Sequence, residues 1–446
     1  MRPHTDLQPT ATPRADAEVL AEQGLALVVA PGRAADPAFE RHTTAVERGF
    51  YEQVPSGEAM AQLLEAGEAD GRRMVDVRPL GADPATTRPV ATFEDFRSEL
   101  TVSPGVAVSA WLISGVTVDP GFRRRGLLRT MMTRSLADAV AAGVPVAALT
   151  ASEAAIYGRF GFGAATRWRR ARLDTRGDVR LRGAPSTGRV TREEPREVGA
   201  LADELYQRVR RLTPGATQRP TMTAIGWEDR SRFKNDGKGS GLYAAVHRDA
   251  AGTAQGIALY RPQGWDVEPP TVTMELFLAL TPDARRGLLT HLTSLDLIER
   301  IVWERAPEAG WPEALLEDER RLRTERDGDD LYLRILDVPA ALGARADLGD
   351  GEVVVDVTDP LGHAAGAWRI RARDGVAEVT EAAEGEAELG LDVADLSAVW
   401  LGGHGAAGGV AARVATGLVR EVVPGAGARL DALLRPSVPV RSLVGF

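Results

Sequence analysis

The chain has 446 residues, more than one typical hydrophobic core holds, so its length predicts two or three domains. It contains no cysteine, which excludes disulfides, thiolate metal sites and a cysteine nucleophile, and its six histidines show no metal-site spacing, so we expect no metal. The net charge of −9 argues against general nucleic-acid binding and suits a cationic partner.

The sequence gives no sign of membrane insertion or export. It holds no run of about 18 apolar residues, so we expect no membrane span. Residues 1–16 are polar and contain proline, and they lack the apolar core of a signal peptide. We interpret them as a flexible tail on a cytoplasmic protein.

The first part of the chain alternates short apolar runs with amphipathic segments. Strands are predicted at residues 25–30, 74–77, 89–102, 106–118 and 146–150, with a closing strand at 168–173. Helices are predicted at residues 37–49, 60–66 and about 127–142, with a short helix around Tyr157. Antiparallel strands followed by strand–helix–strand indicate a mixed α/β layer.

The turn between strand 106–118 and the next helix is the most informative stretch. It holds Arg123, Arg124, Arg125 and Gly126 directly before the helix. A helix N-terminus offers unpaired N–H groups and a positive dipole end, and glycine lets a ligand approach the backbone. We interpret the turn as an anion site for a pyrophosphate. The alternative is an ordinary turn with solvated arginines.

A Gly/Pro/Ser-rich stretch at residues 176–189 predicts a domain boundary. A helix at 193–212 and strands at 242–246, 254–260 and 271–280 follow it. Residues 281–289 then repeat the earlier pattern of a proline turn and Arg-Arg-Gly-Leu-Leu, and they predict a helix that runs to Val302. Because this copy is one residue shorter and lacks one arginine, we expect a degenerate unit that keeps the fold without the ligand.

A third region begins at residues 331–338. It is predicted to contain strands at 352–357, 366–372 and 376–381 and helices at 392–401, 409–416 and 427–434, an order typical of an α+β domain. Chain ends usually fray and carry charge. This chain ends on apolar residues and Phe446, which predicts that its end docks on the protein.

The stretch Arg123-x-x-Gly126-x-Leu128 resembles the acetyl-CoA loop of GCN5-related N-acetyltransferases (GNAT), with Leu128 replacing a small residue. Together with residues 151–161 (Ala-Ser-Glu-x-x-Ile-Tyr-Gly-Arg-Phe-Gly) and the ending at 438–446, it is similar to the enhanced intracellular survival (Eis) family of actinobacterial acetyltransferases. The resemblance covers nearly the whole chain. It implies an α/β and α+β fold of tandem GNAT-like domains, the second degenerate, followed by a sterol-carrier-protein-like domain. The expected domains are 1–178, 187–334 and 335–446.

The resemblance implies an N-acetyltransferase that moves acetyl from acetyl-CoA to primary amines of aminoglycoside-like or polyamine-like cations, and a homo-hexamer. It places the pantetheine and thioester along Val116, Thr117 and Val118, where a splayed strand leaves N–H groups free. The alternative is that this strand is fully paired. The residues expected to hold the rest of the cofactor are Arg124, Arg125, Gly126, Leu127, Leu128 and Arg129.

Tyr157 is the expected general acid, because a phenol titrates near pH ~10 and can protonate a departing thiolate. The alternative is a core tyrosine with a satisfied hydroxyl. Ser152 and Glu153 are expected near the cofactor, although Ser152 is also a candidate helix cap.

The resemblance implies that the α-carboxylate of Phe446 is the general base. Because such a carboxylate titrates near ~3.5, burial or a water relay is needed. The alternative is a disordered tail. Relatives carry an acidic residue where this chain has Gly445. Glu47 and Glu52 either contact the acetyl acceptor or are solvated surface residues.

Two other functions remain open at this point. One is a protein-lysine acetyltransferase for which small amines are incidental. The other is a non-catalytic module that binds acyl-CoA or lipid through the third domain, which would need a large apolar cavity within residues 335–446.

Overall fold

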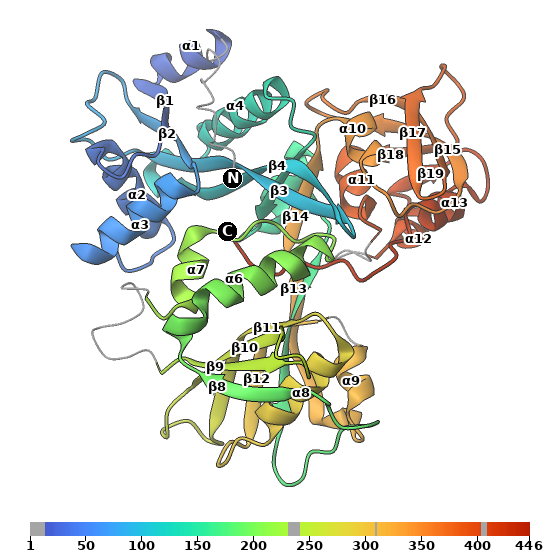
Figure 1. Cartoon of the computed structure of the whole chain (residues 1–446). Coiled ribbons are helices and arrows are strands. Elements are labelled where there is room, and N and C mark those ends of the chain that lie inside the picture. Colours follow the sequence, from blue (N-terminus) through green and yellow to red (C-terminus); the bar gives the residue numbers. More distant parts are fainter. Residues whose placement is uncertain (1–13, 231–240, 308–309, 403–407) are drawn as a thin grey trace.

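The computed structural model describes residues 14–230, 241–307, 310–402 and 408–446, and these residues form three β-sheets with helices around them (Figure 1). Of the tail expected at residues 1–16, residues 1–13 lie outside the described residues. Residues 14–16 belong to helix α1 (Arg14–Glu22) rather than to a tail.

The first sheet has seven strands in the order β1-β2-β3-β4-β5-β14-β6. Its strands are β1 (Leu25–Pro31), β2 (Arg73–Pro79), β3 (Ala91–Ser103), β4 (Val106–Val118), β5 (Val146–Thr150), β6 (Gly163–Ala164) and β14 (Leu331–Ile335). Its helices are α1, α2 (Pro37–Gly49), α3 (Glu58–Ala69), α4 (Leu127–Ala141) and α5 (Ala154–Tyr157), with 3₁₀ turns at Pro120–Phe122 and Gly158–Phe160.

Helices cover both faces of this first sheet. Met74 and Val75 are neighbours on β2 and point to opposite faces. Met74 packs with apolar residues of α2 and α3, whereas Val75 packs in the cluster that contains the buried side of α4. The face under α2 and α3 also holds the charged residues described below.

The second sheet has the order β13-β7-β12-β11-β10-β9-β8. Its strands are β7 (Arg167–Asp174), β8 (Arg189–Glu193), β9 (Tyr243–Arg248), β10 (Ala254–Pro262), β11 (Thr271–Ala279), β12 (Arg300–Ala306) and β13 (Leu322–Asp329). Its helices are α6 (Pro195–Arg211), α7 (Thr221–Trp227), α8 (Pro282–Thr293) and α9 (Trp311–Leu315), with a 3₁₀ turn at Glu319–Arg321.

The third sheet has the order β17-β16-β15-β18-β19. Its strands are β15 (Gly351–Thr358), β16 (Gly366–Arg373), β17 (Val376–Glu381), β18 (Leu389–Asp392) and β19 (Val419–Glu421). Its helices are α10 (Val338–Gly343), α11 (Val393–Val399), α12 (Val410–Thr416) and α13 (Ala426–Leu434).

The first two sheets each contain a strand from the other's part of the sequence. The predicted closing strand of the first unit, now β7, pairs with β12 and β13 in the second sheet, so that expectation was wrong. Strand β14, expected to open the third region, pairs with β5 and β6 instead, and Figure 1 shows it in orange among the strands of the first sheet. Hydrophobic patterning identifies a strand but not the sheet to which the strand belongs. The expected domain boundaries, 1–178, 187–334 and 335–446, stay predictions.

The repeated Arg-Arg-Gly motif also has a different structure from the one expected. Helix α8 ends at Thr293, not at Val302, and β12 begins at Arg300. The helix begins at Pro282, so Arg286 and Gly287 lie inside it instead of in a turn before it. The missing residue therefore converts the loop of the first unit into a continuous helix.

The last residues of the chain connect all three units, and the expected docking is confirmed. Val440 is buried in a cluster with the third sheet, and Leu443 and Val444 are buried against α6 of the second unit. The Phe446 ring then meets the Phe96 ring of β3 edge-on, with 6.2 Å between centroids. Figure 1 shows this red segment returning to the first sheet.

Candidate active site

Strands β4 and β5 separate at the end of the first sheet and open a gap. Their parallel pairing runs from Ala110–Val146 to Ile113–Leu149, while β4 continues to Val118. On its other edge β4 stays paired with β3 through Thr117 and Val118. The edge of β4 that faces β5 is therefore free beyond Ile113 to bind an extended group.

A bulge on β4 shapes this edge. The register with β3 shifts between Thr92 and Glu94, which inserts one extra residue near Gly115. Gly115 has φ +59°, and a Cβ there would lie 2.9 Å from Cγ of Glu94, so only glycine fits. Thr92 Oγ1 donates a 2.8 Å hydrogen bond to the Gly115 carbonyl, and it also lies 2.7 Å from Thr117 Oγ1.

The predicted anion turn lies where the sequence pattern places it. Gly126 is the N-cap residue of α4 with φ +83°, and a Cβ there would meet no protein atom within 4 Å. Among the described residues, none accepts a hydrogen bond from the first-turn N–H groups of Leu127, Leu128 and Arg129. Arg124, with φ +62°, and Arg125 are exposed. This turn can hold a phosphate group by backbone N–H groups and surrounding cations.

A cavity of about 360 Å³ lies at the gap between β4 and β5. Its wall residues are Phe50, Ile113, Ser114, Gly115, Val116, Leu149, Thr150, Ala151, Ser152, Tyr157 and Phe446. The structure thus brings Ser152 and Tyr157, from one stretch of sequence, together with Val116 and Phe446, which lie far from them in the sequence. Thr117 and Val118 lie further along the same free edge, toward the anion turn.

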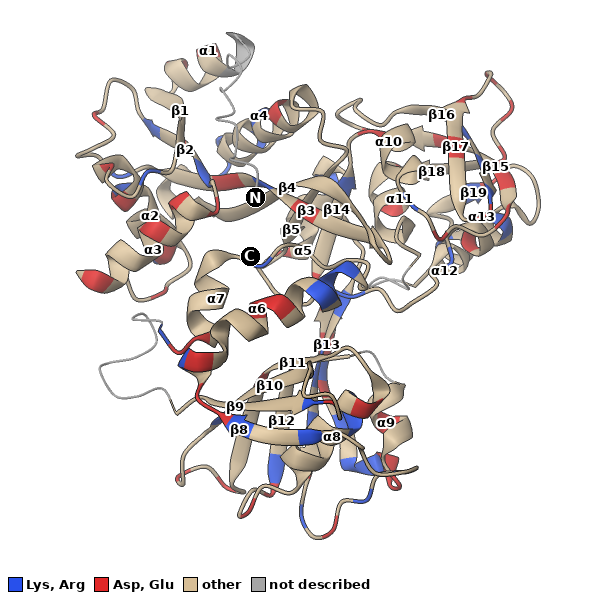
Figure 2. Ribbon diagram, in the orientation of Figure 1, with Lys and Arg blue, Asp and Glu red and all other residues tan. Residues whose placement is uncertain are grey.

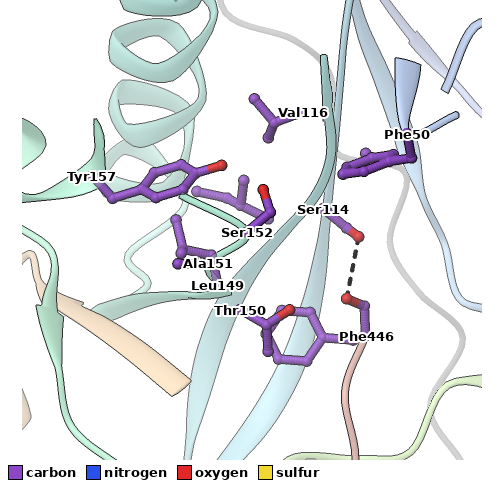
Figure 3. Close-up of a pocket in the computed structure, with 11 residues that line it drawn as sticks. Phe50, Ser114, Val116, Leu149, Thr150, Ala151, Ser152, Tyr157 and Phe446 are labelled. Carbon is purple, nitrogen blue, oxygen red and sulfur yellow. Dashed lines mark hydrogen bonds between the residues drawn. The ribbon is translucent and has the colours of Figure 1, made fainter. Parts of the chain in front are cut away.

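Tyr157 is the last residue of α5 and is only 6% exposed. Its ring contacts Phe162 edge-on at 6.3 Å, and Figure 3 shows its hydroxyl pointing toward Ser152 and the strand that bears Val116. No described residue hydrogen-bonds to this hydroxyl, unlike the satisfied core tyrosine considered as the alternative. Burial raises the pKa of Tyr157, and the charge of Glu153 raises it further, so the phenol stays protonated at neutral pH.

Ser152 and Glu153 are exposed residues between β5 and α5. Glu153, not Ser152, is the N-cap residue of α5, and no side chain caps that helix. The capping role considered for Ser152 is therefore wrong, and its side chain contributes to the cavity wall.

Phe446 lies on the opposite side of the cavity from Tyr157 (Figure 3). Ser114 Oγ donates a 3.2 Å hydrogen bond to a carboxyl oxygen of Phe446. The preceding residue, Gly445, lies beside Arg305, whose Nη2 would be 3.4 Å from a Cβ at that position. Arg305 itself pairs with Asp330 at 2.7 Å.

A buried charge network behind the bulge was not predicted. His42 of α2 is fully buried, with Nδ1 2.7 Å from Asp76 and Nε2 3.0 Å from Glu94. Burial by itself lowers the pKa of His42, but the charges of Asp76 and Glu94 and their hydrogen bonds raise it to about 9. Arg72 also pairs with Glu94.

The same network acts on Glu94, which lies directly under Gly115. Burial raises the pKa of Glu94, but the charge of Arg72 and hydrogen bonds from His42 and Arg72 outweigh it and lower the pKa to about 2. The available signal was the set of acidic residues Glu94, Asp95 and Glu99 inside the predicted strand 89–102, since a buried carboxylate needs partners. Its partners lie on other elements and cannot be found from local spacing.

Within the described residues, no group of three or more His, Asp or Glu side chains is arranged to bind a metal ion. None of the described helices is long and apolar enough to cross a membrane.

Comparisons with known proteins agree with this architecture. The profile of the acetyltransferase (GNAT) domain matches residues 44–165, and a second GNAT profile matches residues 215–335. The sterol carrier protein domain matches residues 338–442. These matches confirm the expected tandem GNAT fold with a sterol-carrier-like third domain.

Relatives match over most of their length. An uncharacterized N-acetyltransferase of Streptomyces avermitilis is 39% identical over 379 residues, 82% of this chain and 87% of that protein. The N-acetyltransferase Eis of Mycobacterium tuberculosis is 34% identical over 369 residues, 80% of this chain and 85% of that protein. The crystal structure of Eis1 from Mycobacterium abscessus aligns with a TM-score of 0.77 at 26% identity, over 94% of this chain and 100% of that one. The chain therefore belongs to the Eis family of GNAT N-acetyltransferases.

Proposed function

We propose that this N-acetyltransferase transfers acetyl from acetyl-CoA directly to primary amines of small polycations, of the aminoglycoside or polyamine type. The observation that carries the proposal is one cavity, at the gap between β4 and β5, whose walls include both Tyr157 and Phe446. A proton donor and a carboxylate on opposite sides of one cavity suit an acyl transfer that needs both an acid and a base.

The anion turn and the free edge of β4 would hold acetyl-CoA. The N–H groups of Leu127, Leu128 and Arg129 would bind the pyrophosphate, with Arg124 and Arg125 adding charge around Gly126. The free edge at Val116, Thr117 and Val118 would pair with the pantetheine, near Ser152 and Glu153. This placement directs the thioester toward the cavity that contains Tyr157.

Acetyl-CoA supplies an activated acyl group whose carbonyl carbon the amine attacks as the bond to sulfur breaks. Tyr157 would protonate the departing thiolate, and its raised pKa keeps that proton in place until it is needed. The Phe446 carboxylate would take the proton of the attacking ammonium, directly or through a water, while Ser114 fixes its orientation. A backbone N–H near the bulge would stabilise negative charge on the carbonyl oxygen.

Acidic residues near the cavity support a cationic acceptor. Figure 2 shows acidic residues, in red, on α2 and α3. Glu47, near the end of α2, is half-buried, and burial followed by the charges of Glu52 and Glu94 raises its pKa, so a bound cation would be favourable there. On the other side, a cavity of about 290 Å³ shares Thr150 and Ala151 with the first one.

The walls of that second cavity compensate in part for Gly445. They include Glu304, Asp329 and Asp330. Asp330 pairs with Arg305, Glu304 lies 3.6 Å from Arg170, and Asp329 accepts a 2.7 Å hydrogen bond from the Tyr332 hydroxyl. Carboxylates thus lie close to the position where relatives carry an acid.

We also propose that the protein is a hexamer and is located in the cytoplasm. The mass of the purified protein in solution tests the hexamer.

The test is release of free thiol from acetyl-CoA by the untagged full chain, with aminoglycosides, polyamines and lysine peptides as acceptors. The Tyr157→Phe variant serves as the matched inactive control. Turnover on several multi-amine cations supports the proposal. Turnover on lysine peptides alone would instead make the chain a protein-lysine acetyltransferase, and tight acetyl-CoA binding without thiol release would indicate a binding module.

A further inference from the structure

The charge network behind the catalytic gap takes no part in the proposed transfer, yet it contacts both sides of that gap. Glu94 lies at its centre, with Oε1 3.0 Å from His42 Nε2 and the other carboxylate oxygen bound by Arg72. His42 Nδ1 lies 2.7 Å from Asp76, which accepts a 2.6 Å hydrogen bond from Arg78. With His42 protonated, positive and negative groups alternate along these contacts, which fixes the Glu94 carboxylate in one place.

The first contact of Glu94 is with the bulge on β4. Glu94 lies opposite Ser114 in the β3–β4 register. It packs under Gly115 so closely that a Cβ there would lie 2.9 Å from Glu94 Cγ and 3.0 Å from Cδ. Gly115, with φ +59°, has no side chain to limit its own conformation, so a fixed group beneath it limits the bulge instead. Glu94 thus restrains the strand edge proposed to receive the thioester.

The second contact leads to the end of the chain. The guanidinium of Arg72, which pairs with Glu94, lies 4.7 Å from the centroid of the Phe96 ring. The Phe96 ring in turn meets the Phe446 ring edge-on at 6.2 Å. A cation over its face and a ring at close range hold Phe96 in a defined orientation. Movement of the Glu94 carboxylate would therefore reach Phe446 through two side chains.

Helix α2 connects the network to the catalytic gap a third time. His42 lies on this helix, and the last residue of the helix is Gly49. A Cβ on Gly49 would lie 2.5 Å from Cβ of Thr117, so the helix end packs directly on the cofactor edge of β4. The next residue, Phe50, forms part of the cavity wall (Figure 3). The contact between His42 and Glu94 therefore also fixes this helix end beside the gap.

We propose that Glu94 is a positioning residue for acetyl transfer, which holds the β4 bulge and the Phe446 carboxylate in a fixed relation to each other. The inference rests on the proposed function, in which the thioester lies at the bulge and Phe446 supplies the base. A displacement of ~1 Å between reacting groups can cost ~100-fold in rate, so the position of both groups matters. In this role Glu94 does not contact the substrates and acts through Gly115 on one side and Arg72 on the other.

The test measures kcat and the KM for acetyl-CoA of the full chain with Glu94→Gln, a change that keeps the shape of the side chain and removes its charge. Active sites are counted by titration with acetyl-CoA. The kcat per site should fall by about tenfold, while the KM changes by less than about twofold.

Asp95→Asn is the matched control, because Asp95 is the next residue of β3 and lies on the opposite face of the sheet. It is fully buried, pairs with Arg73 at 2.7 Å and accepts a 2.6 Å hydrogen bond from Ser135 of α4. This variant also breaks a buried ion pair, so it should lose stability, but its kcat per site should equal that of the wild type.

A double-mutant cycle with Ser114→Ala separates positioning from a purely structural role. Ser114→Ala alone should lower kcat by about fivefold. In the Glu94→Gln background it should cost less than about twofold, because the Phe446 carboxylate is already displaced. In the Asp95→Asn background the full fivefold loss of ~1 kcal/mol should persist.

Two results would overturn the proposal: a wild-type kcat in Glu94→Gln, or losses from Glu94→Gln and Ser114→Ala that simply multiply in the double variant. If Glu94→Gln does not fold, Arg72→Gln replaces it, since this change leaves the contact of Glu94 with His42 in place. Arg72→Gln should lower kcat by at least about threefold, and a wild-type kcat there would equally overturn the proposal. Failure of the proposed function is distinct, because the wild-type chain would then release no thiol with any amine.

Discussion

Ser114 and Phe446 are 332 residues apart in the chain, yet Ser114 Oγ donates a hydrogen bond to the carboxyl group of Phe446. Ser114 is the first residue of β4 beyond its pairing with β5, so this bond joins the end of the chain to the strand edge proposed to hold the thioester. Two packed clusters fix the segment that delivers Phe446. One contains Val440 and Phe446 with residues of the first and third sheets, and the other contains Leu443 and Val444 with residues of the second unit. The orientation of the carboxylate thus depends on all three units.

The first prediction concerns this hydrogen bond. Ser114→Ala should lower kcat by about fivefold, because a hydrogen bond to a charged group contributes about 1 kcal/mol or more. The KM for acetyl-CoA should change little. Ser109→Ala is the matched control, since Ser109 lies on the same strand and no described residue is a hydrogen-bond partner of its buried hydroxyl. Equal kinetics of the two variants would show that Ser114 does not orient the base.

The second prediction concerns Tyr157. Tyr157→Phe should lower kcat by about 100-fold or more, because it removes the proton donor while keeping the ring that packs on Phe162. The dissociation constant of acetyl-CoA, measured by titration, should stay within about twofold. Tyr260→Phe in the second unit is the control and should retain wild-type turnover. A Tyr157→Phe enzyme with normal kcat would remove Tyr157 from the mechanism.

The third prediction concerns the arginines of the anion turn. Because Arg124 and Arg129 are exposed, we expect each Gln variant to raise the KM for acetyl-CoA by only about fivefold, equivalent to about 1 kcal/mol. Turnover at saturating acetyl-CoA should be retained, and added salt should reduce the difference. Arg189→Gln, another exposed arginine, serves as the control. An unchanged KM in both variants would leave the backbone N–H groups as the only phosphate contacts.

The fourth prediction is a pH dependence of stability caused by His42. The pKa of His42 is raised from 6.5 to about 9 in the folded protein. The stability that the protonated His42 contributes is therefore complete below pH 6.5 and is lost as the pH rises through 9. Between these values the wild type should lose on the order of 3 kcal/mol of unfolding free energy relative to His42→Gln. Denaturant unfolding over pH 6 to ~10 measures this difference.

The control for this prediction is His291→Gln. Burial and then the charge of Arg192 lower the pKa of His291, so this variant should alter stability on the acid side and leave the alkaline loss intact. Parallel stability curves for wild type and His42→Gln above pH 6.5 would contradict the account of a protonated His42 in the folded protein.

Features set by contiguous residues could be predicted from the sequence. The turn at Arg123 to Gly126 has its chemistry within one stretch, so the strand, the glycine N-cap and the buried face of α4 follow from local spacing. The family resemblance supplied Tyr157 and Phe446, because their motifs surround each residue in sequence. The α+β third domain was also predictable from the order of its patterns.

Features set by distant partners could not be predicted. Strand β7 alternates arginines with apolar residues, a pattern that any half-buried strand can show. Its place in the second sheet depends on β12 and β13, which lie more than a hundred residues later. His42, Asp76 and Glu94 come from three separate elements, and each alone is typical of a surface residue. The prediction of a turn before α8 was wrong, because in this copy of the motif, which is one residue shorter, the glycine lies inside the helix.

The central claim is that acetyl transfer depends on the carboxylate of Phe446, and kcat of the chain with one glycine added after Phe446 tests it most directly. The account predicts a loss of about 100-fold or more, because the carboxylate is displaced from Ser114, with melting temperature and acetyl-CoA affinity unchanged. Phe446→Leu, which keeps the carboxylate in place, should lose only a few-fold. Full turnover by the extended chain would contradict the account and place the base elsewhere in the cavity.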